Sequence, residues 1–464
     1  MIPRVRRSIL RSNTAVATVL AIAVASTAVA QQPAPSSLGE PVRLSLGDAA
    51  RRAARQSNSV QGAEQRAAEA QARVTQARAA LYPDLSANVL QSGRTFNSVT
   101  FGISIPPAPG QAPLFDPAGN VLGPVNTVDL RGRVQANIFD YSVLQRLRSA
   151  QTTASAARAD VSTAGDLAAM QAADAYIRVL RTNAQLQARL ADSALARDLV
   201  TIAQSQLEAG VGVALDVTRA QSQLAAVRTQ LISARNDRDR AQLDLRRSLN
   251  LALDTPVQLT DTLSTTIPED LALDEPTATA RAMRDRPDLR AAEEQLRAAR
   301  QTASAIRSER LPSLSAFGDD GVIGKSSATR LLPTYTWGVQ LSLPVFDGFR
   351  REGRIQEQQA VTRELDVRRR DLEQQASIDV RGALLDLASA REAIGVSRER
   401  LRLAEQEVDQ ARQRFRAGVA GNADVVNAAL SLNAARSQYV DVLTSLQVAR
   451  VSLARAEGAV TQLR

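Results

Sequence analysis

Two stretches of the chain, about residues 140–209 and 349–417, keep a helical period for about seventy residues each without a proline. At 1.5 Å per residue, each predicts a helix roughly 100 Å long. Globular helices rarely reach this length, whereas coiled-coil helices do. A second helical segment follows each stretch, with small apolar residues three or four apart: Val217, Ala220, Leu224, Val227, Leu231 and Ala234, then Val425, Ala428, Leu432, Ala435, Tyr439, Leu443 and Leu446. This pattern predicts an extended helical bundle.

Apolar and polar residues alternate in four shorter segments, which predicts strands at about 85–98, 128–138, 313–318 and 334–343. A Pro/Gly-rich loop at about 102–124 separates the first two strands, and a turn at Asp319–Gly324 separates the other two. The alternation is typical of a soluble, half-buried sheet. It is equally typical of a membrane barrel with lipid outside and water inside.

The same order of elements occurs twice. Repeat 1 spans residues 44–251 and repeat 2 spans 277–464, with a Pro-containing linker at 252–276. Each repeat begins with one helix, from about 45 to 81 and from 277 to 310, which Pro83 and Pro312 end. Two strands, a very long helix, a tight tip and a last helix follow. The fold class is therefore mainly α, with four strands per chain.

Four strands cannot close a barrel, but three chains would supply twelve strands, enough for a wide barrel with a wet interior. The alternative is a small soluble sheet that caps a coiled coil.

The tips carry the clearest repeated motif, since Gly, Asp, Val, Leu and Arg recur at one constant offset between residues 207–228 and 415–436. Gly210 and Gly418 stand where a helix should end, because glycine adopts the left-handed conformation without Cβ strain. Asp216 and Asp424 stand where the next helix should start, as N-cap or first-turn residues. Each copy therefore predicts the tip of a long helical hairpin.

Residues 1–30 have the pattern of a secretory signal peptide: a basic start, an apolar stretch and Ala28-Val29-Ala30 before Gln31. The alternative is a membrane anchor, which the shortness of the apolar run disfavours. Residues 31–43 are predicted to form a flexible linker. No later run of about twenty apolar residues occurs, so a membrane contact of the mature chain would need strands.

The amino-acid composition argues against an enzyme and against a nucleic-acid-binding protein. The chain has no cysteine and no histidine, which removes the thiolate nucleophile and the commonest general base and neutral metal ligand. The formal charge of +9 includes four arginines of the signal segment, and the arginines elsewhere alternate with acids, so a nucleic-acid-binding surface is not expected. We also expect no cofactor. The adjacent pair Asp319-Asp320 leaves a carboxylate hydrolase as a weak alternative, but it fits turn chemistry better. We expect no enzymatic activity.

The sequence resembles the TolC family of outer-membrane efflux proteins over about residues 40–460. The motifs that carry the resemblance are Arg286-Pro-Asp-Leu-Arg290 with Arg310-Leu-Pro-Ser-Leu314, Leu341-Ser-Leu-Pro-Val-Phe-Asp-Gly348, and the two tip segments. The resemblance implies a homotrimer in the Gram-negative outer membrane, with a twelve-stranded barrel in lipid continuous with a long periplasmic α-helical barrel. It implies a passive exit duct for tripartite efflux or type I secretion. Its partners would be a periplasmic adaptor protein and an inner-membrane pump of the RND, ABC or MFS type. The cargo, whether drug, metal or protein, stays open, and a soluble periplasmic coiled-coil structural or adaptor protein is the alternative function.

The resemblance also implies roles for single residues. Asp216 and Asp424 would line the periplasmic aperture, with Phe415 and Asn427 also at it, unless the two aspartates serve only to cap their helices. The family pattern has a tyrosine, an arginine and a second aspartate where this chain has Phe415, Ala420 and Asn427, so polar partners of a closed aperture are missing. The adaptor would dock on the tips, at Gly210, Val211, Gly212, Gly418, Val419 and Gly421. Tyr335 and Trp337 would belong to an aromatic girdle at the membrane interface, or else are ordinary strand residues.

Overall fold

The computed structural model describes residues 41–101, 110, 119, 121–265, 274–327, 330–419 and 421–463. The predicted signal peptide, residues 31–40 of the predicted linker, most of the Pro/Gly-rich loop and Ala420 lie outside the described residues. The end of the predicted linker is not flexible chain, because Val42 and Arg43 belong to a short strand. From Val42 onward the chain forms one compact unit. Within the described part, no helix has the combination of length and apolar character that crossing a bilayer requires.

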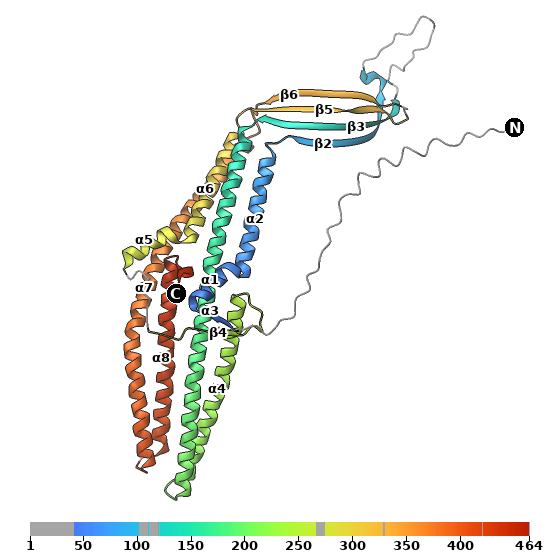
Figure 1. Ribbon diagram of the computed structural model, residues 1–464. Helices are drawn as coiled ribbons and strands as arrows, with labels where there is room; N and C mark the ends of the chain where they lie inside the picture. Colours follow the sequence, from blue (N-terminus) through green and yellow to red (C-terminus); the bar gives the residue numbers. More distant parts are fainter. Residues whose placement is uncertain are drawn as a thin grey trace, which may run out of the picture. The chain divides into compact units, whose positions relative to one another are not determined.

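Eight α-helices and six strands are found in the described part (Figure 1). The first half holds β1 (Val42–Leu44), α1 (Leu46–Gln56), α2 (Asn58–Ala79), β2 (Asp84–Asn97), β3 (Val121–Phe139), α3 (Tyr141–Glu208) and α4 (Ala214–Ser248). The second half holds β4 (Val257–Leu259), α5 (Glu275–Asp285), α6 (Pro287–Ser308), β5 (Ser313–Lys325), β6 (Leu332–Ser342), α7 (Arg350–Arg416) and α8 (Asn422–Ala456). The second half repeats the order of the first.

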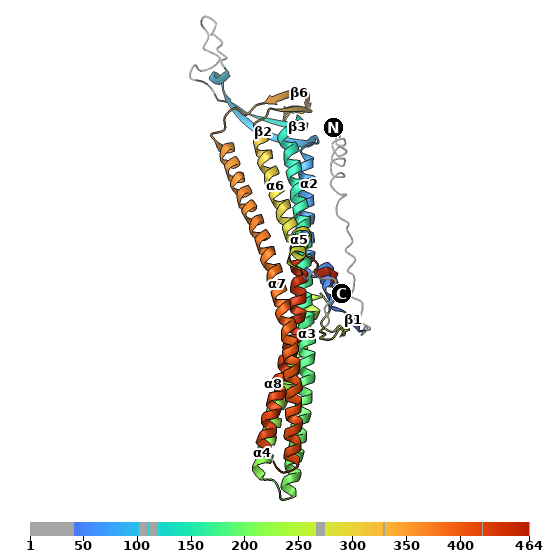
Figure 2. The same cartoon turned by 90° about the vertical axis from the view of Figure 1, so that its left-hand side faces the viewer.

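The two very long helices are present as predicted, with 68 residues in α3 and 67 in α7. Asp140 begins α3, because its carboxylate accepts hydrogen bonds from the backbone N–H groups of Ser142 and Val143. α3 starts directly after β3 and its cap Asp140, whereas residues 343–349 connect β6 to α7. Both helices then run unbroken from the end of the sheet to a hairpin tip (Figures 1 and 2). α3 pairs with α4, α7 pairs with α8, and the two hairpins meet mainly through α3 and α8.

The leading helix of each repeat is wrongly predicted as one piece, since the structure has two helices in each case. Ser57 is extended between α1 and α2, and its hydroxyl accepts a hydrogen bond from Val60 N–H at the start of α2. In repeat 2 the break lies at Arg286, which is also extended. Pro287 follows it and occupies the first position of α6, because proline lacks an N–H and disfavours helical geometry in the residue before it.

The main sheet is antiparallel, with strand order β2-β3-β5-β6. The turn predicted at Asp319–Gly324 is wrong, because β5 runs through it to Lys325 and pairs with β3 and β6 on its two sides. Gly321 serves close strand approach here instead of a turn: a Cβ at this residue would lie 2.2 Å from the carbonyl oxygen of Leu130. The predicted loop 102–124 also ends earlier than expected, since β3 begins at Val121 and includes Pro124.

The strand register separates the two faces of this sheet by chemistry. One face carries Arg131, Arg133 and Asp319, and Arg131 forms ion pairs with both Asp129 and Asp319. The other face carries mainly apolar residues, among them Leu85, Val89, Val134, Trp337 and Leu341. Leu85 is 79% exposed and Trp337 77% exposed, so within one chain nothing covers the apolar face at these positions.

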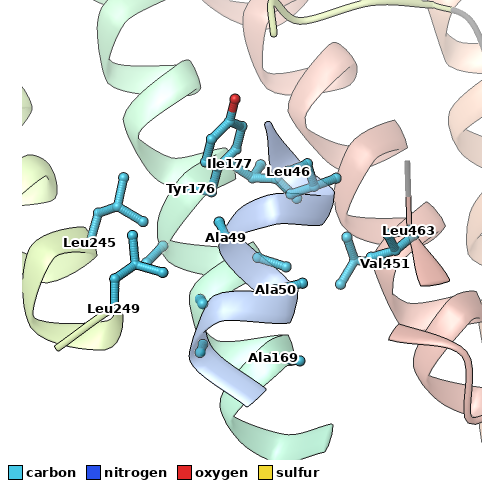
Figure 3. Close-up of a cluster of buried hydrophobic side chains, with 14 of the residues drawn as sticks. Leu46, Ala49, Ala50, Ala169, Tyr176, Ile177, Leu245, Leu249, Val451 and Leu463 are labelled. Carbon is cyan, nitrogen blue, oxygen red and sulfur yellow. The ribbon is translucent and has the colours of Figure 1, made fainter. Parts of the chain in front are cut away.

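The largest hydrophobic core lies where α1, α3, α4, α8 and the chain end meet the small parallel sheet of β1 and β4 (Figure 3). Tyr176 of α3 is fully buried there, and its hydroxyl donates a hydrogen bond to the carbonyl oxygen of Leu44 at 2.9 Å. Ala49 and Ala50 of α1 and Ala169 of α3 belong to the same core, and their small side chains let α1 lie close against α3. This core joins the first and last parts of the chain.

A cluster of charged residues lies where α6 packs against α3 and α7. Arg286 is buried and forms ion pairs with Asp288 of α6 at 2.7 Å and Asp379 of α7 at 2.8 Å. Asp166 of α3 lies in the same electrostatic environment. Burial raises its pKa to about 6, with Arg455 and Arg286 lowering it and Asp288 raising it further.

The Asp166→Asn variant is expected to be more stable than the wild type at pH 8 by at most about 3 kcal/mol. Because the folded-state pKa is raised from 3.8 to about 6, the wild type has its full stability at low pH and loses part of it as the pH rises through 6. The thermal midpoint of the helical circular dichroism signal, measured from pH 4 to pH 8, tests this. The two proteins should converge near pH 4. Asp237→Asn, at an exposed position of α4, is the control, and an equal gain in that variant would contradict the assignment.

Candidate functional site

The long helices of both hairpins, α3 and α7, end at their tips with the same backbone geometry. Gly210 and Gly418 have φ values of 74° and 71°, in the left-handed region, as the sequence predicts. At the first tip, Gly210 N–H donates to Leu207 O and Val211 N–H donates to Gln206 O, both at 3.0 Å. Gly418 and Val419 make the equivalent bonds to Phe415 O and Arg414 O. This pattern is the Schellman motif, which satisfies the last carbonyl groups of α3 and α7.

Asp216 and Asp424 lie in the first turn of α4 and α8, and not at the N-cap, which is Val213 in α4 and Gly421 in α8. Of the two positions that the sequence allows, the structure therefore selects the first turn. A carboxylate there is stabilised by the positive end of the helix dipole. Asp216 is half-buried and Asp424 is exposed, and Asn427, one turn after Asp424, is exposed as well. Asp424 and Asn427 thus share one helix face.

Phe415 differs from the expectation that it lies at the aperture. Its side chain is only 2% exposed and packs in a hydrophobic cluster with Leu199, Leu224 and Val425. The cluster takes side chains from both hairpins, so Phe415 joins them inside one chain and does not face an opening. An aromatic ring without a hydroxyl fits this apolar environment because no polar atom is left unpaired.

Two amide side chains tie the tips to each other. Gln206 Nε2 donates to the carbonyl oxygen of Phe415 at 2.6 Å, and Asn422 Nδ2 donates to the carbonyl oxygen of Asp216 at 2.8 Å. Asn422 is fully buried. We call these two bonds the tip tie. Neither amide has a counterpart in the other repeat, where Arg414 and Ala214 stand, so the repeat pattern provides no signal for them.

A polar seam continues the contact between the hairpins along α3 and α8. Asp192 of α3 is 6% exposed and pairs with Arg436 of α8 at 2.8 Å and with Arg189 at 3.3 Å. Arg189 also donates to Asn433 and Ser437 of α8. Closer to the tip, Arg412 of α7 lies 3.5 Å from Asp198 of α3. The two hairpins are therefore joined by ion pairs along their length and by neutral amide bonds at the tips.

The outer surface of the tips is apolar. Val211 is 76% exposed and Val419 is 68% exposed, while Gly210, Gly418 and Gly421 are also exposed and Gly212 is half-buried. The single chain does not bury these apolar side chains, and exposed apolar surface of this kind is typical of a contact with another protein. Among the described residues, no group of three or more acidic, histidine or cysteine residues gathers in one place as a metal site would need.

Tyr335 and Trp337 lie on the apolar face of β6, with 76% and 77% of their surface exposed. Asp319 and Asp320, which the sequence places in a turn, lie within β5 and point to opposite faces of the sheet. Because consecutive strand residues face opposite sides, the two carboxylates are not arranged as a catalytic pair.

Comparison with known proteins agrees with this architecture. The family model described as outer membrane efflux protein matches residues 49–251 and 279–459. The toluene efflux pump outer membrane protein TtgF of Pseudomonas putida is 29% identical over 299 residues, which cover 59% of this chain and 57% of that protein. The alkaline protease secretion protein AprF of Pseudomonas aeruginosa is 24% identical over 325 residues, 66% of this chain and 64% of that protein. The chain thus spans less than two thirds of the length of these relatives.

Solved structures show the same fold. The outer-membrane channel OprN has a TM-score of 0.73 at 18% identity, covering 90% of this chain and 91% of that one. The CmeC outer membrane channel of Campylobacter jejuni has a TM-score of 0.75 at 16% identity, covering 89% and 85%. The outer membrane protein VceC of Vibrio cholerae has a TM-score of 0.72 at 18% identity, covering 89% and 96%. The family match covers most of both repeats and the fold is shared, so the chain belongs to the outer membrane efflux protein family.

Proposed function

We propose that the protein is the passive exit duct of a tripartite efflux or type I secretion system. Three copies would close their sheets into one twelve-stranded barrel in the outer membrane. The helices would form a periplasmic conduit below it. An inner-membrane pump of the RND, ABC or MFS type would supply the energy and connect to the duct through a periplasmic adaptor. In this proposal the signal segment 1–30 is removed on export.

The observation that carries the proposal is the exposed apolar face of the sheet, with charged residues on the opposite face. A soluble sheet buries its apolar face, whereas a barrel strand turns it to lipid. In addition, β2 and β6 are edge strands, each paired on one side only among the described strands. Long unpaired edges favour pairing with another chain. Three sheets joined edge to edge would leave no open edge.

The relatives support two kinds of cargo, since TtgF is named for toluene efflux and AprF for protease secretion. The exposed valines Val211 and Val419 at the tips suit contact with another protein, and we assign the adaptor to this surface. A soluble coiled-coil adaptor is the second candidate function. It is disfavoured because such a protein would expose Leu85, Tyr335 and Trp337 to water.

Membrane extraction tests the duct. The mature protein should leave membranes only with detergent and should run as a trimer, and its trimers should conduct ions in planar bilayers. Release by high salt alone, as a soluble monomer, would favour the coiled-coil adaptor.

At the tips of a trimer, Asp216 and Asp424 would place six carboxylates around one opening and favour cations. The Asp424→Ala variant is therefore expected to reduce the cation-to-anion permeability ratio several-fold and to weaken block by trivalent cations applied from the tip side. Single-trimer recordings in asymmetric salt measure both effects. Asp239→Ala, in the later part of α4, is the matched control. An unchanged ratio and unchanged block in Asp424→Ala would exclude this residue from the aperture.

A further inference from the structure

Asp320 stands on the wrong face of the sheet for a charged residue. The register places it opposite Gly132 of β3 and Tyr335 of β6, on the apolar face. Among the described strand residues paired in this register, it is the one charged residue on that face; the others are apolar or neutral. Its neighbour Asp319 faces the opposite side, where Arg131 pairs with it.

Asp320 is exposed, and no hydrogen bond or ion pair joins it to any described residue. Arg131 and Arg133 flank Gly132, the residue that pairs with Asp320, but the register places both arginines on the polar face. If the protein has the proposed function, the apolar face contacts lipid. An ionised carboxylate in contact with lipid raises the free energy of the protein unless a cation pairs with it. The described strand residues place no such cation on this face, so a partner from the membrane would have to supply it.

The surface around Asp320 is hollowed. Gly132 and Gly318 contribute no side chains, which leaves a hollow of about 540 Å³ beside Asp320, bordered by Leu85, Val134, Tyr335 and Trp337. Arg133 and Asp319 also line the hollow, but the strand register places this pair on the polar face, so their side chains point away from Asp320. Tyr335 lies directly across from Asp320, and Trp337 lies two residues further along the same strand and face. One carboxylate beside two aromatic rings is the arrangement that binds ammonium groups, because the carboxylate pairs with the charge and the ring faces attract it.

We propose that this hollow binds the ammonium headgroup of an aminophospholipid, with Asp320 as its counter-ion and Tyr335 and Trp337 as its aromatic walls. Leu85 and Val134 would contact the adjoining apolar part of the lipid. A zwitterionic ethanolamine lipid carries such a group, whereas an anionic glycerol lipid lacks it. The inference rests on the proposed function, because it requires the apolar face of the sheet to face the bilayer.

Trp337 makes the test specific, since it is the single tryptophan of the chain. The full-length mature protein is reconstituted in phosphatidylcholine vesicles that contain a minor fraction of bromine-labelled phosphatidylethanolamine or phosphatidylglycerol with the same acyl chains. Bromine quenches tryptophan fluorescence only at short range. We expect the ethanolamine lipid to quench Trp337 about threefold more effectively than the glycerol lipid.

Two variants separate the site from the rest of the sheet. Asp320→Asn should abolish the preference for the ethanolamine lipid, and Asp319→Asn should keep it, because Asp319 lies on the other face and Arg131 retains Asp129. Equal quenching by both lipids, or a preference that survives in Asp320→Asn, would overturn the headgroup site and leave the membrane placement intact. Quenching by neither lipid would overturn the headgroup site together with the proposed membrane placement.

Discussion

The Arg286→Ala variant is expected to lose about 3–5 kcal/mol of stability. Arg286 is buried and pairs with Asp288 and Asp379, so it joins the start of α6 to α7. Burial alone raises the pKa of Asp288, but the hydrogen bonds and charge of Arg286 hold it below its usual value. Removal of the guanidinium leaves two carboxylates side by side without a cation. Thermal unfolding in detergent at pH 7.5, followed by circular dichroism, measures the loss.

The matched control is Arg402→Ala, because Arg402 also pairs with a carboxylate, Glu399, but both side chains are more than half exposed. Exposed pairs of this kind contribute about 1 kcal/mol or less. The double variant Arg286→Ala/Asp379→Asn should recover part of the loss, since it removes one of the stranded charges. If Arg286→Ala destabilised the protein no more than Arg402→Ala, the buried cluster would have no role in joining α6 to α7.

The Phe415→Ala variant is expected to loosen the two tips from each other. Truncation of a buried phenylalanine costs about 3–5 kcal/mol, and here the lost contacts are those between the hairpins. Because both tips lie at the end of the bundle, we expect local opening instead of global unfolding. Amide hydrogen exchange at about residues 410–425 should accelerate at least about 100-fold.

Leu387→Ala provides the comparison, since Leu387 is equally buried but belongs to a separate cluster formed by α5, α7 and α8. This variant should lower the overall stability to a similar extent and leave exchange at the tips close to that of the wild type. Equal acceleration at the tips in both variants would contradict the local role of Phe415. Retention of the tip tie in Phe415→Ala is expected, because Gln206 bonds to a main-chain carbonyl that the substitution keeps.

The parts of the fold predicted best are those that depend on neighbours in sequence. Gly210 and Gly418 form the predicted helix ends because the left-handed conformation is a property of the residue itself. The 68- and 67-residue helices are predicted to within a few residues, because their period is sustained and no proline interrupts it. The family resemblance rests on the same local motifs, and the comparisons confirm it.

The errors arise where a local preference competes with a contact from a distant part of the chain. Asp319–Gly324 has the composition of a turn, but pairing with β3 and β6 on both sides holds it as a strand. Pro287 is compatible with either the start of a helix or a break within one, and the ion pairs of Arg286 with Asp288 and Asp379 belong to the break. In each case a bond to a residue far away in sequence takes part, since β5 pairs with β3 and Arg286 pairs with Asp379.

At the hairpin tips, some features are determined by the local sequence and others by tertiary packing. Local sequence determines that two hairpins end in glycine and that Asp216 and Asp424 follow within the first turn of the next helix, because caps and dipoles act over a few residues. The packing of the two hairpins against each other decides that Phe415 is core, that Gln206 and Asn422 tie the tips, and that Asp424 stays exposed. These outcomes depend on the register between helices about 200 residues apart in sequence, which is set by side-chain packing and not by any local pattern.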